Sequence, residues 1–138
     1  KNLALLTQKK KKIFYINGND FNTKDGTCVR DYIHIIDLTD IHLKVYDFLR
    51  KKNKSIVLNC GYGKGYSVLE IVDKSKKFIK GLILKFKNRR IGDASSAYCS
   101  NYKLKKTLKW KPKYAGITHM INSAIKWENN LKKKIISS

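Results

Sequence analysis

Hydrophobic residues recur along this chain at helical spacing in some stretches and in short continuous runs in others. Helical spacing predicts helices at the following places: Leu3–Leu6, Leu38–Leu49, Val68–Phe78, Tyr102–Trp110 (short) and from about Gly116 to Leu131. Short apolar runs predict strands at Lys12–Gly18, Val29–Ile36, Ser55–Asn59 and Gly81–Lys87, with Val29–Ile36 and Ser55–Asn59 expected to be buried. Alternating short strands and helices indicate an α/β fold with too few strands for a complete doubly wound sheet.

Polar residues at the helix starts sharpen this prediction. Asp37 is expected to cap the helix that follows the Val29–Ile36 run. Ser67 and Glu70 have the spacing of a capping box and are expected to begin the next helix. The polar stretches Asn19–Thr27 and Asn88–Asn101 are predicted loops.

Three alternating glycines, Gly61, Gly63 and Gly65, precede the capped helix. A dinucleotide-binding turn has the spacing G-x-G-x-x-G and an acidic residue about twenty positions later. The spacing here is G-x-G-x-G, and Lys80–Lys87 contains no acidic residue. We interpret the stretch as a tight turn before a helix, with no cofactor bound to it.

The composition fits one domain or one lobe of a larger protein. The chain has 138 residues, 42% of them hydrophobic, and a formal net charge of +21. Only four of its 31 basic residues are Arg (Arg30, Arg50, Arg89 and Arg90), and the lysines are scattered along the whole length. Nucleic-acid sites favour Arg and stacked aromatic residues, so we interpret the charge as a compositional bias and expect no nucleic-acid partner.

Cys28, Cys60 and Cys99 are an odd number of widely spaced cysteines without a CxxC pair. Free thiols in a reducing cytoplasm are expected, and no metal site. No apolar run approaches the roughly 18 residues of a membrane span, so no membrane association is expected.

Two stretches carry most of the functional information: "DGTCVRDYIHIIDLTDIH" (Asp25–His42) and "RRIGDASSAY" (Arg89–Tyr98). With "NGND", "LNCGYGKGYSVLE" and "LKWKPKY…INSAIKWENN", they resemble the C-terminal part of the UDP-glucose 4-epimerases. That family belongs to the extended short-chain dehydrogenases/reductases, also described as the NAD-dependent epimerase/dehydratase family. The resemblance runs from about Ile13 to Asn130.

The resemblance implies a two-lobed enzyme that interconverts UDP-glucose and UDP-galactose through a 4-keto intermediate. An N-terminal Rossmann lobe would bind NAD and carry a catalytic Tyr-x-x-x-Lys. Residues 1–138 match the smaller C-terminal lobe, which binds the UDP-sugar. We therefore expect no catalytic, cofactor-binding or metal-binding residue in this chain, no turnover by the chain alone, and a homodimeric full-length protein.

By the same resemblance, Arg30 and Arg90 would hold the diphosphate from facing loops, as Arg binds phosphates bidentately. Asp93 would accept hydrogen bonds from the ribose, and Gly92 would supply a backbone angle that disfavours other residues. Tyr15, Ile16 and Asn17 would lie along the uracil.

Simpler interpretations stand beside these roles. Arg30 could pair with the neighbouring Asp31, and Asp93 could cap its own loop. His34 and His42 are expected to be structural, with His34 in a buried strand. For the whole chain, an epimerase acting on another nucleotide sugar (a uronate or a pentose) and a basic nucleic-acid-binding module remain as alternatives.

Overall fold

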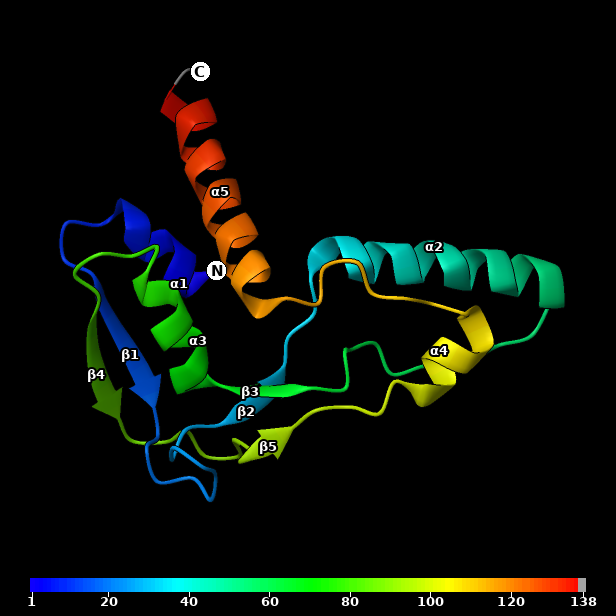
Figure 1. The fold of residues 1–138 in the computed structure, drawn as a ribbon, viewed down its shortest axis with the longest axis horizontal. Coiled ribbons are helices and arrows are strands. Elements are labelled where there is room, and N and C mark those ends of the chain that lie inside the picture. The colour runs from blue at the N-terminus through cyan, green and yellow to red at the C-terminus, as the bar shows by residue number, and fades with distance from the viewer. Residues whose placement is uncertain (137–138) are drawn as a thin grey trace.

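The structure, a computed structural model, describes residues 1–136 and alternates short strands with helices (Figure 1). The longest elements are two helices, which project from a group of short strands. In chain order the elements are α1 (Asn2–Leu5), the 3₁₀ helix η1 (Leu6–Gln8), β1 (Ile13–Asn17), β2 (Val29–Asp31), α2 (Ile35–Lys52), β3 (Gly65–Ser67), α3 (Val68–Lys76), β4 (Ile83–Lys87), β5 (Ser96–Ala97), α4 (Tyr102–Leu108) and α5 (Ile117–Ile136).

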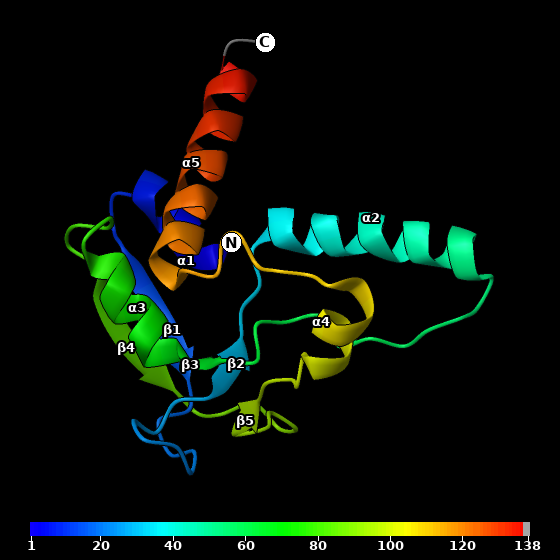
Figure 2. The ribbon, with the colours of Figure 1, turned by 45° about the vertical axis from the view of Figure 1, so that its right-hand side comes forward.

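The strands form two small sheets. β1 and β4 pair in parallel from Ile13 opposite Ile83 to Asn17 opposite Lys87. β2 is the centre of the other sheet, antiparallel to β3 and parallel to β5. The loop from β4 to β5 therefore connects the two sheets, and β5 lies beside β2 in both ribbon views (Figures 1 and 2).

Two hydrophobic clusters hold these elements together. The larger one joins the two ends of the chain, because α1 and η1 pack against α5 and the end of the α3 region. Its buried members are Ala4, Leu6, Ile79, Ile117, Ile121 and Ile125. In the smaller cluster Ile41 of α2 meets Leu104 of α4 and Trp110. Burying each large aliphatic side chain contributes about 1.5–3 kcal/mol, so these clusters are the main source of stability.

Several predicted elements are confirmed at nearly their predicted bounds. The capping box forms as expected: the Ser67 hydroxyl accepts from the Glu70 N–H at 3.0 Å, and the Glu70 carboxylate accepts from the Ser67 N–H at 2.8 Å. β1, β4, α4 and α5 also lie where the pattern of apolar residues predicted them.

Four local predictions are wrong: the extent of the Val29–Ile36 strand, the cap of α2, the strand at Ser55–Asn59, and the loop Asn88–Asn101, which contains β5 (Ser96–Ala97). The Val29–Ile36 run is a strand only as far as Asp31, and His34, rather than Asp37, is the N-cap of α2. His34 has extended backbone angles and its side chain accepts from the Ile36 N–H, so the helix begins three residues earlier than expected. Ser55–Asn59 is not a buried strand: it is extended, but the described residues contain no strand beside it, and Val57 is 82% exposed.

Candidate functional site

The predicted uracil-binding residues lie on β1, which has β4 on one side only among the described strands. Ile16 is 2% exposed, so its side chain belongs to the interior and only its backbone is available to a ligand. Tyr15 points the other way and is 46% exposed, with Lys87 Nζ 4.4 Å from the centroid of its ring. In a strand with one neighbour, half of the backbone N–H and C=O groups are free to bind a flat polar ring.

Arg30 lies in the middle of β2, between Tyr66 of β3 and Ala97 of β5. Its side chain is half-buried, and Nη1 donates to the Val29 backbone oxygen at 2.8 Å. Among the side chains described, those of residues 1–132, Arg30 makes no ion pair. Pairing with Asp31, the simpler interpretation, is therefore not what the structure has, and the positive charge is available to an anion.

The two arginines of "RRIGD" have different environments. Arg89 Nε lies 3.4 Å from Asp20 Oδ2, and its guanidinium lies 5.6 Å from the centroid of the Phe21 ring. Arg89 therefore fastens the end of β4 to the loop that follows β1. Arg90 has a side chain that is 70% exposed, and its Nε donates to Asp93 Oδ2 at 3.1 Å.

Arg90 and Asp93 belong to one tight turn. The Asp93 N–H donates to the Arg90 backbone oxygen at 3.3 Å, and Gly92 between them has a φ of +84°. A Cβ at Gly92 would meet nothing within 4 Å, so glycine is needed there for its backbone angle, as predicted. The structure thus brings Arg90 and Asp93 together on the loop that leads into β5, next to the strand that carries Arg30.

The glycine turn binds a carboxylate of its own chain. Asp31 Oδ1 accepts from the Tyr62 N–H at 3.1 Å, and Asp31 Oδ2 accepts from the Gly63 N–H at 2.9 Å. A Cβ at Gly61 would lie 2.5 Å from Asp31 Oδ2, and one at Gly65 would lie 2.4 Å from Val29. Gly61 and Gly65 therefore provide close packing against β2, and the amides of Tyr62 and Gly63 hold Asp31 where a phosphate would sit in a cofactor turn.

The "DGT" motif fixes the start of α3. Asp25 Oδ1 accepts from the Thr27 N–H at 2.9 Å and from the Thr27 hydroxyl at 2.7 Å, and Asp25 Oδ2 accepts from the Ser67 hydroxyl. Burial alone would raise the pKa of Asp25, but the hydrogen bonds from Ser67 and Thr27 outweigh it and lower the pKa. This motif is structural and holds the loop before β2 against the capped helix.

The "VRDYIH" element contributes a second polar network at the start of α2. Asp37 is 1% exposed, and its carboxylate accepts from the Tyr62 hydroxyl at 2.6 Å and from the backbone N–H groups of Lys113 and Tyr114. The Tyr62 hydroxyl in turn accepts from the His34 N–H at 3.1 Å. The network joins the glycine turn, α2 and the segment before α5, which lie far apart in the sequence.

His34 is held as a neutral ring in one tautomer. Its Nδ1 accepts from the Ile36 N–H at 3.2 Å, so the hydrogen is on Nε2, which donates to Ser123 Oγ at 3.0 Å. The Ser123 hydroxyl donates onward to the Met120 backbone oxygen. The ring of His34 also stacks on Tyr114, with centroids 4.8 Å apart. His34 thereby connects α2 to α5.

The ionisation of this network suits a structural role. Burial lowers the pKa of His34, and the nearby His119 lowers it further. Burial would raise the pKa of Asp37, but hydrogen bonds from Tyr62, Tyr114 and Lys113 lower it below its usual value. Burial and the bond to Asp37 raise the pKa of Tyr62. None of these shifts moves a pKa towards 7, where a general acid or base works best.

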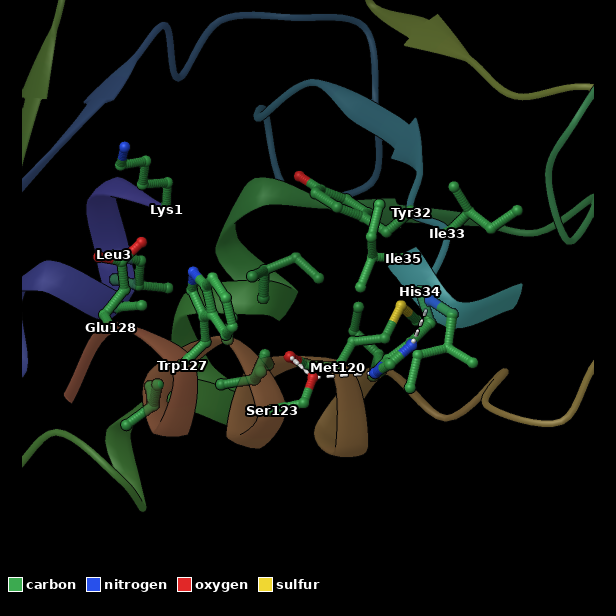
Figure 3. Close-up of a pocket in the computed structure, with 17 residues that line it drawn as sticks. Lys1, Leu3, Tyr32, Ile33, His34, Ile35, Met120, Ser123, Trp127 and Glu128 are labelled. Atoms are coloured by element: carbon green, nitrogen blue, oxygen red, sulfur yellow. Dashed lines mark hydrogen bonds between the residues drawn. The ribbon is translucent and has the colours of Figure 1, made fainter. Parts of the chain in front are cut away.

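Two hollows lie apart from the predicted substrate residues. An open hollow of about 910 Å³ between α1, the start of α2 and α5 is lined by apolar side chains that include Tyr32, Ile35, Met120 and Trp127 (Figure 3). A smaller one of about 530 Å³ lies between Tyr62 and Tyr102. Neither is lined by Arg30, Arg90 or Asp93. An apolar hollow is a poor site for a diphosphate, whose charges need cationic partners.

The sequence singled out the arginines and Asp93 as candidates but did not indicate the polar networks. Asp31, Asp37 and Tyr62 were not singled out as buried partners, because the residues that they contact lie 25 to 77 positions away. One signal was available in the sequence: Asp31 lies within the mostly apolar run Val29–Ile36, and Asp37 directly follows it. Within the described residues, no group of three or more metal-ligating side chains gathers, and no helix is long and apolar enough to span a membrane.

No family model matches the chain, but curated relatives do. It is 37% identical over 122 residues to the UDP-glucose 4-epimerase of Azospirillum brasilense, covering 87% of this chain and 35% of the relative. It is 45% identical over 116 residues to UDP-glucose 4-epimerase 1 of Oryza sativa subsp. japonica, covering 81% of this chain and 32% of the relative. The chain therefore spans about a third of the length of the curated relatives that it matches.

Solved structures agree with this similarity. The UDP-glucose 4-epimerase of Stenotrophomonas maltophila, with bound NAD and formylated UDP-arabinopyranose, superposes with a TM-score of 0.87 at 30% identity. That match covers 96% of this chain and 39% of the other. The UDP-Glc/GlcNAc 4-epimerase of Campylobacter jejuni superposes with a TM-score of 0.81 at 37% identity, over 93% of this chain and 39% of the other. The arrangement of strands and helices is therefore that of one part of an epimerase.

Proposed function

We infer that this chain belongs to the UDP-glucose 4-epimerases, as their C-terminal, nucleotide-sugar-binding part. The observation that carries the inference is similarity to these enzymes over 87% of this chain but only 35% of a relative's length. The complete enzyme would interconvert UDP-glucose and UDP-galactose. The contribution of this chain would be to hold the UDP portion of the substrate while the sugar reacts elsewhere.

Arg30 and Arg90 would bind the two phosphates. Arg30 is without an ion-pair partner among the side chains described, and Arg90 is exposed on a neighbouring loop. The existing contact between Arg90 and Asp93 would give way to contacts with the ligand, at small cost because exposed ion pairs contribute about 0–1 kcal/mol. Asp93 would then accept from the ribose hydroxyls, and the free edge of β1 at Tyr15, Ile16 and Asn17 would bind the uracil.

The residues of this chain do not fit a dinucleotide. The amides of the glycine turn hold Asp31, and Gly61 and Gly65 leave no space for a ligand between the turn and β2. We therefore propose that NAD, which would exchange a hydride with C4 of the hexose, is bound by the part of the enzyme outside this chain. Anchoring by Arg30 and Arg90 would allow the sugar to turn while the nucleotide stays in place, which is a positioning role.

The test is calorimetric titration of the chain with UDP, comparing Arg90→Ala with Arg50→Ala. Both side chains are exposed, but Arg50 lies on the last turn of α2. Loss of a charged hydrogen bond costs about 1.5–3 kcal/mol, so Arg90→Ala should weaken UDP binding roughly 10- to 150-fold. Arg50→Ala should bind as the parent does. Equal UDP affinity of folded Arg90→Ala and parent chains would contradict the proposal.

Activity gives an independent check. The chain alone, mixed with NAD and UDP-galactose, should give no UDP-glucose, because the groups that react with the sugar would lie outside it. Measurable epimerisation by the purified chain would overturn that assignment while leaving the UDP-binding role in place.

A further inference from the structure

Strand β4 has one hydrogen-bonded edge and one open edge. The Ile83 N–H donates to the Lys12 backbone oxygen at 2.8 Å, so the backbone of Ile83 faces β1. Because alternate residues of a strand face the same neighbour, the N–H and C=O groups of Leu84 and Phe86 are directed away from β1. Among the described residues, no other strand pairs with β4, and no hydrogen bond outside the β1 ladder reaches these groups. Figure 1 shows β4 on the outside of the pair.

The side chains of β4 are basic on one face of the sheet and apolar on the other. Lys85 and Lys87 are exposed on the same face as Tyr15, which lies opposite Lys85 in the ladder. Phe86 belongs to the other face and is 47% exposed. Neither β1 nor β4 contains an acidic residue. The open edge therefore presents positive charge above the sheet and an aromatic ring below it.

The positive charge of this edge is not offset by nearby carboxylates. From residue 74 to residue 92 the chain has eight basic residues and no acidic one. The ion pairs of the described side chains use only three of these, namely Lys76, Arg89 and Arg90. Lys85 and Lys87 therefore have no carboxylate partner among the described side chains, and their charges are available to a ligand.

A second copy of this chain does not fit the open edge. Pairing of two β4 strands would bring their lysines at positions 85 and 87 close together, and like charges opposite each other in a sheet are destabilising. The net charge of +21 adds a general repulsion between copies. Lysines on an edge strand oppose self-pairing for this reason. The same lysines favour a strand of opposite charge.

We propose that the open edge of β4 binds an extended acidic segment of another protein, which adds to the sheet as a third strand. The free backbone groups of Leu84 and Phe86 pair with the added strand, as in other cases of strand addition. A segment that alternates acidic and apolar residues places its carboxylates beside Lys85 and Lys87 and its apolar side chains beside Phe86. The proposed uracil position is the free edge of β1, on the other side of the pair. The inference therefore does not depend on the proposed function.

The experiment is a fluorescence anisotropy titration of the 138-residue chain with three labelled peptides. The first peptide, TEVEVET, alternates Glu with Val. The second, TQVQVQT, is its neutral counterpart, and the third is TEVEVET methylated at every interior backbone nitrogen. TEVEVET should bind at least ~10-fold more tightly than either of the others, since only it offers both carboxylates and backbone donors.

The two control peptides separate charge from pairing. Equal affinity for TEVEVET and its methylated form would show attraction between charges without strand pairing and would overturn the proposal. Equal affinity for TEVEVET and TQVQVQT would overturn it as well, since the lysines would then select nothing. Absence of binding by all three peptides at low salt would have the same consequence.

Charge reversal separates β4 from the rest of the basic surface. Replacing both lysines (Lys85→Glu with Lys87→Glu) should weaken TEVEVET binding at least ~10-fold, because each attractive pair becomes a repulsive one. The matched control is Lys51→Glu with Lys52→Glu, at exposed positions on the last turn of α2. It changes the net charge equally and should alter the affinity less than ~2-fold at 0.1 M salt, where distant charges are screened. An equal loss in both folded variants would overturn the assignment to β4.

Hydrogen exchange locates the bound peptide without any variant. On binding of TEVEVET, the amides of Leu84 and Phe86 should exchange at least ~10-fold more slowly, because they gain hydrogen bonds. The amide of Ile83, which already donates to Lys12, should be protected in both states. Unchanged exchange at Leu84 and Phe86 in a chain saturated with the peptide would place the peptide elsewhere and refute the proposal.

Discussion

At the residue scale, the glycine turn shows a position where only glycine fits, because neighbouring atoms leave no space for a side chain. Gly61 has no unusual backbone angle, but a Cβ there would lie 2.5 Å from Asp31 Oδ2 and 2.6 Å from Cys99 Sγ. Asp31 cannot move away without losing its bonds to the Tyr62 and Gly63 N–H groups. Glycine is therefore required for space, which no spacing rule reveals.

Gly61→Ala should accordingly lower the free energy of unfolding by about 1–3 kcal/mol, the usual cost of overpacking. Gly116→Ala is the matched control, since a Cβ there would come no closer than 3.9 Å to His119 at the start of α5. Urea denaturation of both variants and the parent chain measures the difference. If Gly61→Ala and the parent have equal free energies of unfolding, a Cβ can be accommodated beside Asp31 and glycine is not required there for space.

His34 makes stability depend on pH. Its folded pKa is lowered by burial and by His119, with Asp37 acting in the opposite direction, so the unfolded chain binds the proton more readily. The stabilisation is therefore present above the unfolded pKa of about 6.5 and is lost as the pH falls from there towards the lowered folded value. Protonation would also place a hydrogen on Nδ1, opposite the Ile36 N–H that it accepts from.

His34→Asn should flatten this decline in stability between about pH 6.5 and pH 5, since Asn can cap the helix without titrating there. The measurement is urea denaturation over the pH range. His42→Asn, at an exposed position of α2, is the control and should keep the parent's pH profile. A decline that survives in His34→Asn would assign the pH dependence to another group.

At the element scale, α3 depends on its first residue. Ser67 caps the helix through Glu70 and also donates to Asp25, so two loops meet at one hydroxyl. Ser67→Ala should lower the free energy of unfolding by about 1–2 kcal/mol. Ser100→Ala, on an exposed loop, should change it by less than about 0.5 kcal/mol. Thermal or urea unfolding checks both, and a Ser67→Ala chain as stable as the Ser100→Ala chain would refute the capping argument.

Elements were predictable where the sequence pattern and local contacts agree. The capping box depends on residues three positions apart, and β1, β4 and α5 have clear local patterns of apolar residues, so all of them appear as expected. The start of α2 was misplaced because the His34 side chain caps it, a role more often taken by Ser, Thr, Asp or Asn. Ser55–Asn59 has the sequence of a strand, but pairing is a tertiary contact, and no other strand in the described residues provides it.

The site was predictable to a smaller extent than the fold. The rarity of Arg in a lysine-rich chain singled out Arg30 and Arg90, and the structure places them on a strand and a nearby loop. The sequence did not distinguish Arg89, which pairs with Asp20, from its neighbour Arg90. Nor could it indicate that Asp31 occupies the glycine turn, because that contact spans 31 residues.

For the whole molecule, the dominant electrostatic property is a net charge of +21. The described side chains contain three ion pairs, two of them between residues three positions apart, so little of this charge is offset locally. Self-repulsion of this size destabilises the compact state. Screening weakens it, since the Debye length falls from about 30 Å at 0.01 M salt to about 10 Å at 0.1 M.

The melting temperature should therefore rise when NaCl is increased from about 0.01 M to about 0.1 M. Differential scanning calorimetry measures the shift, and glycerol or sucrose, which carry no charge, give the comparison without screening. A melting temperature that falls with added salt would indicate that attractive ion pairs outweigh the repulsion.

The larger hydrophobic cluster has a consequence for synthesis of the protein. Ala4 and Leu6 are made more than a hundred residues before Ile117, Ile121 and Ile125, which complete their packing. The hydrogen bond from Gln8 to the Glu128 backbone oxygen, at 2.9 Å, spans 120 residues. A nascent chain therefore cannot close this cluster while α5 is still inside the ribosome. The segment with α1 and η1 stays exposed to chaperones and proteases until α5 has been made, and folding around it is expected to be slow.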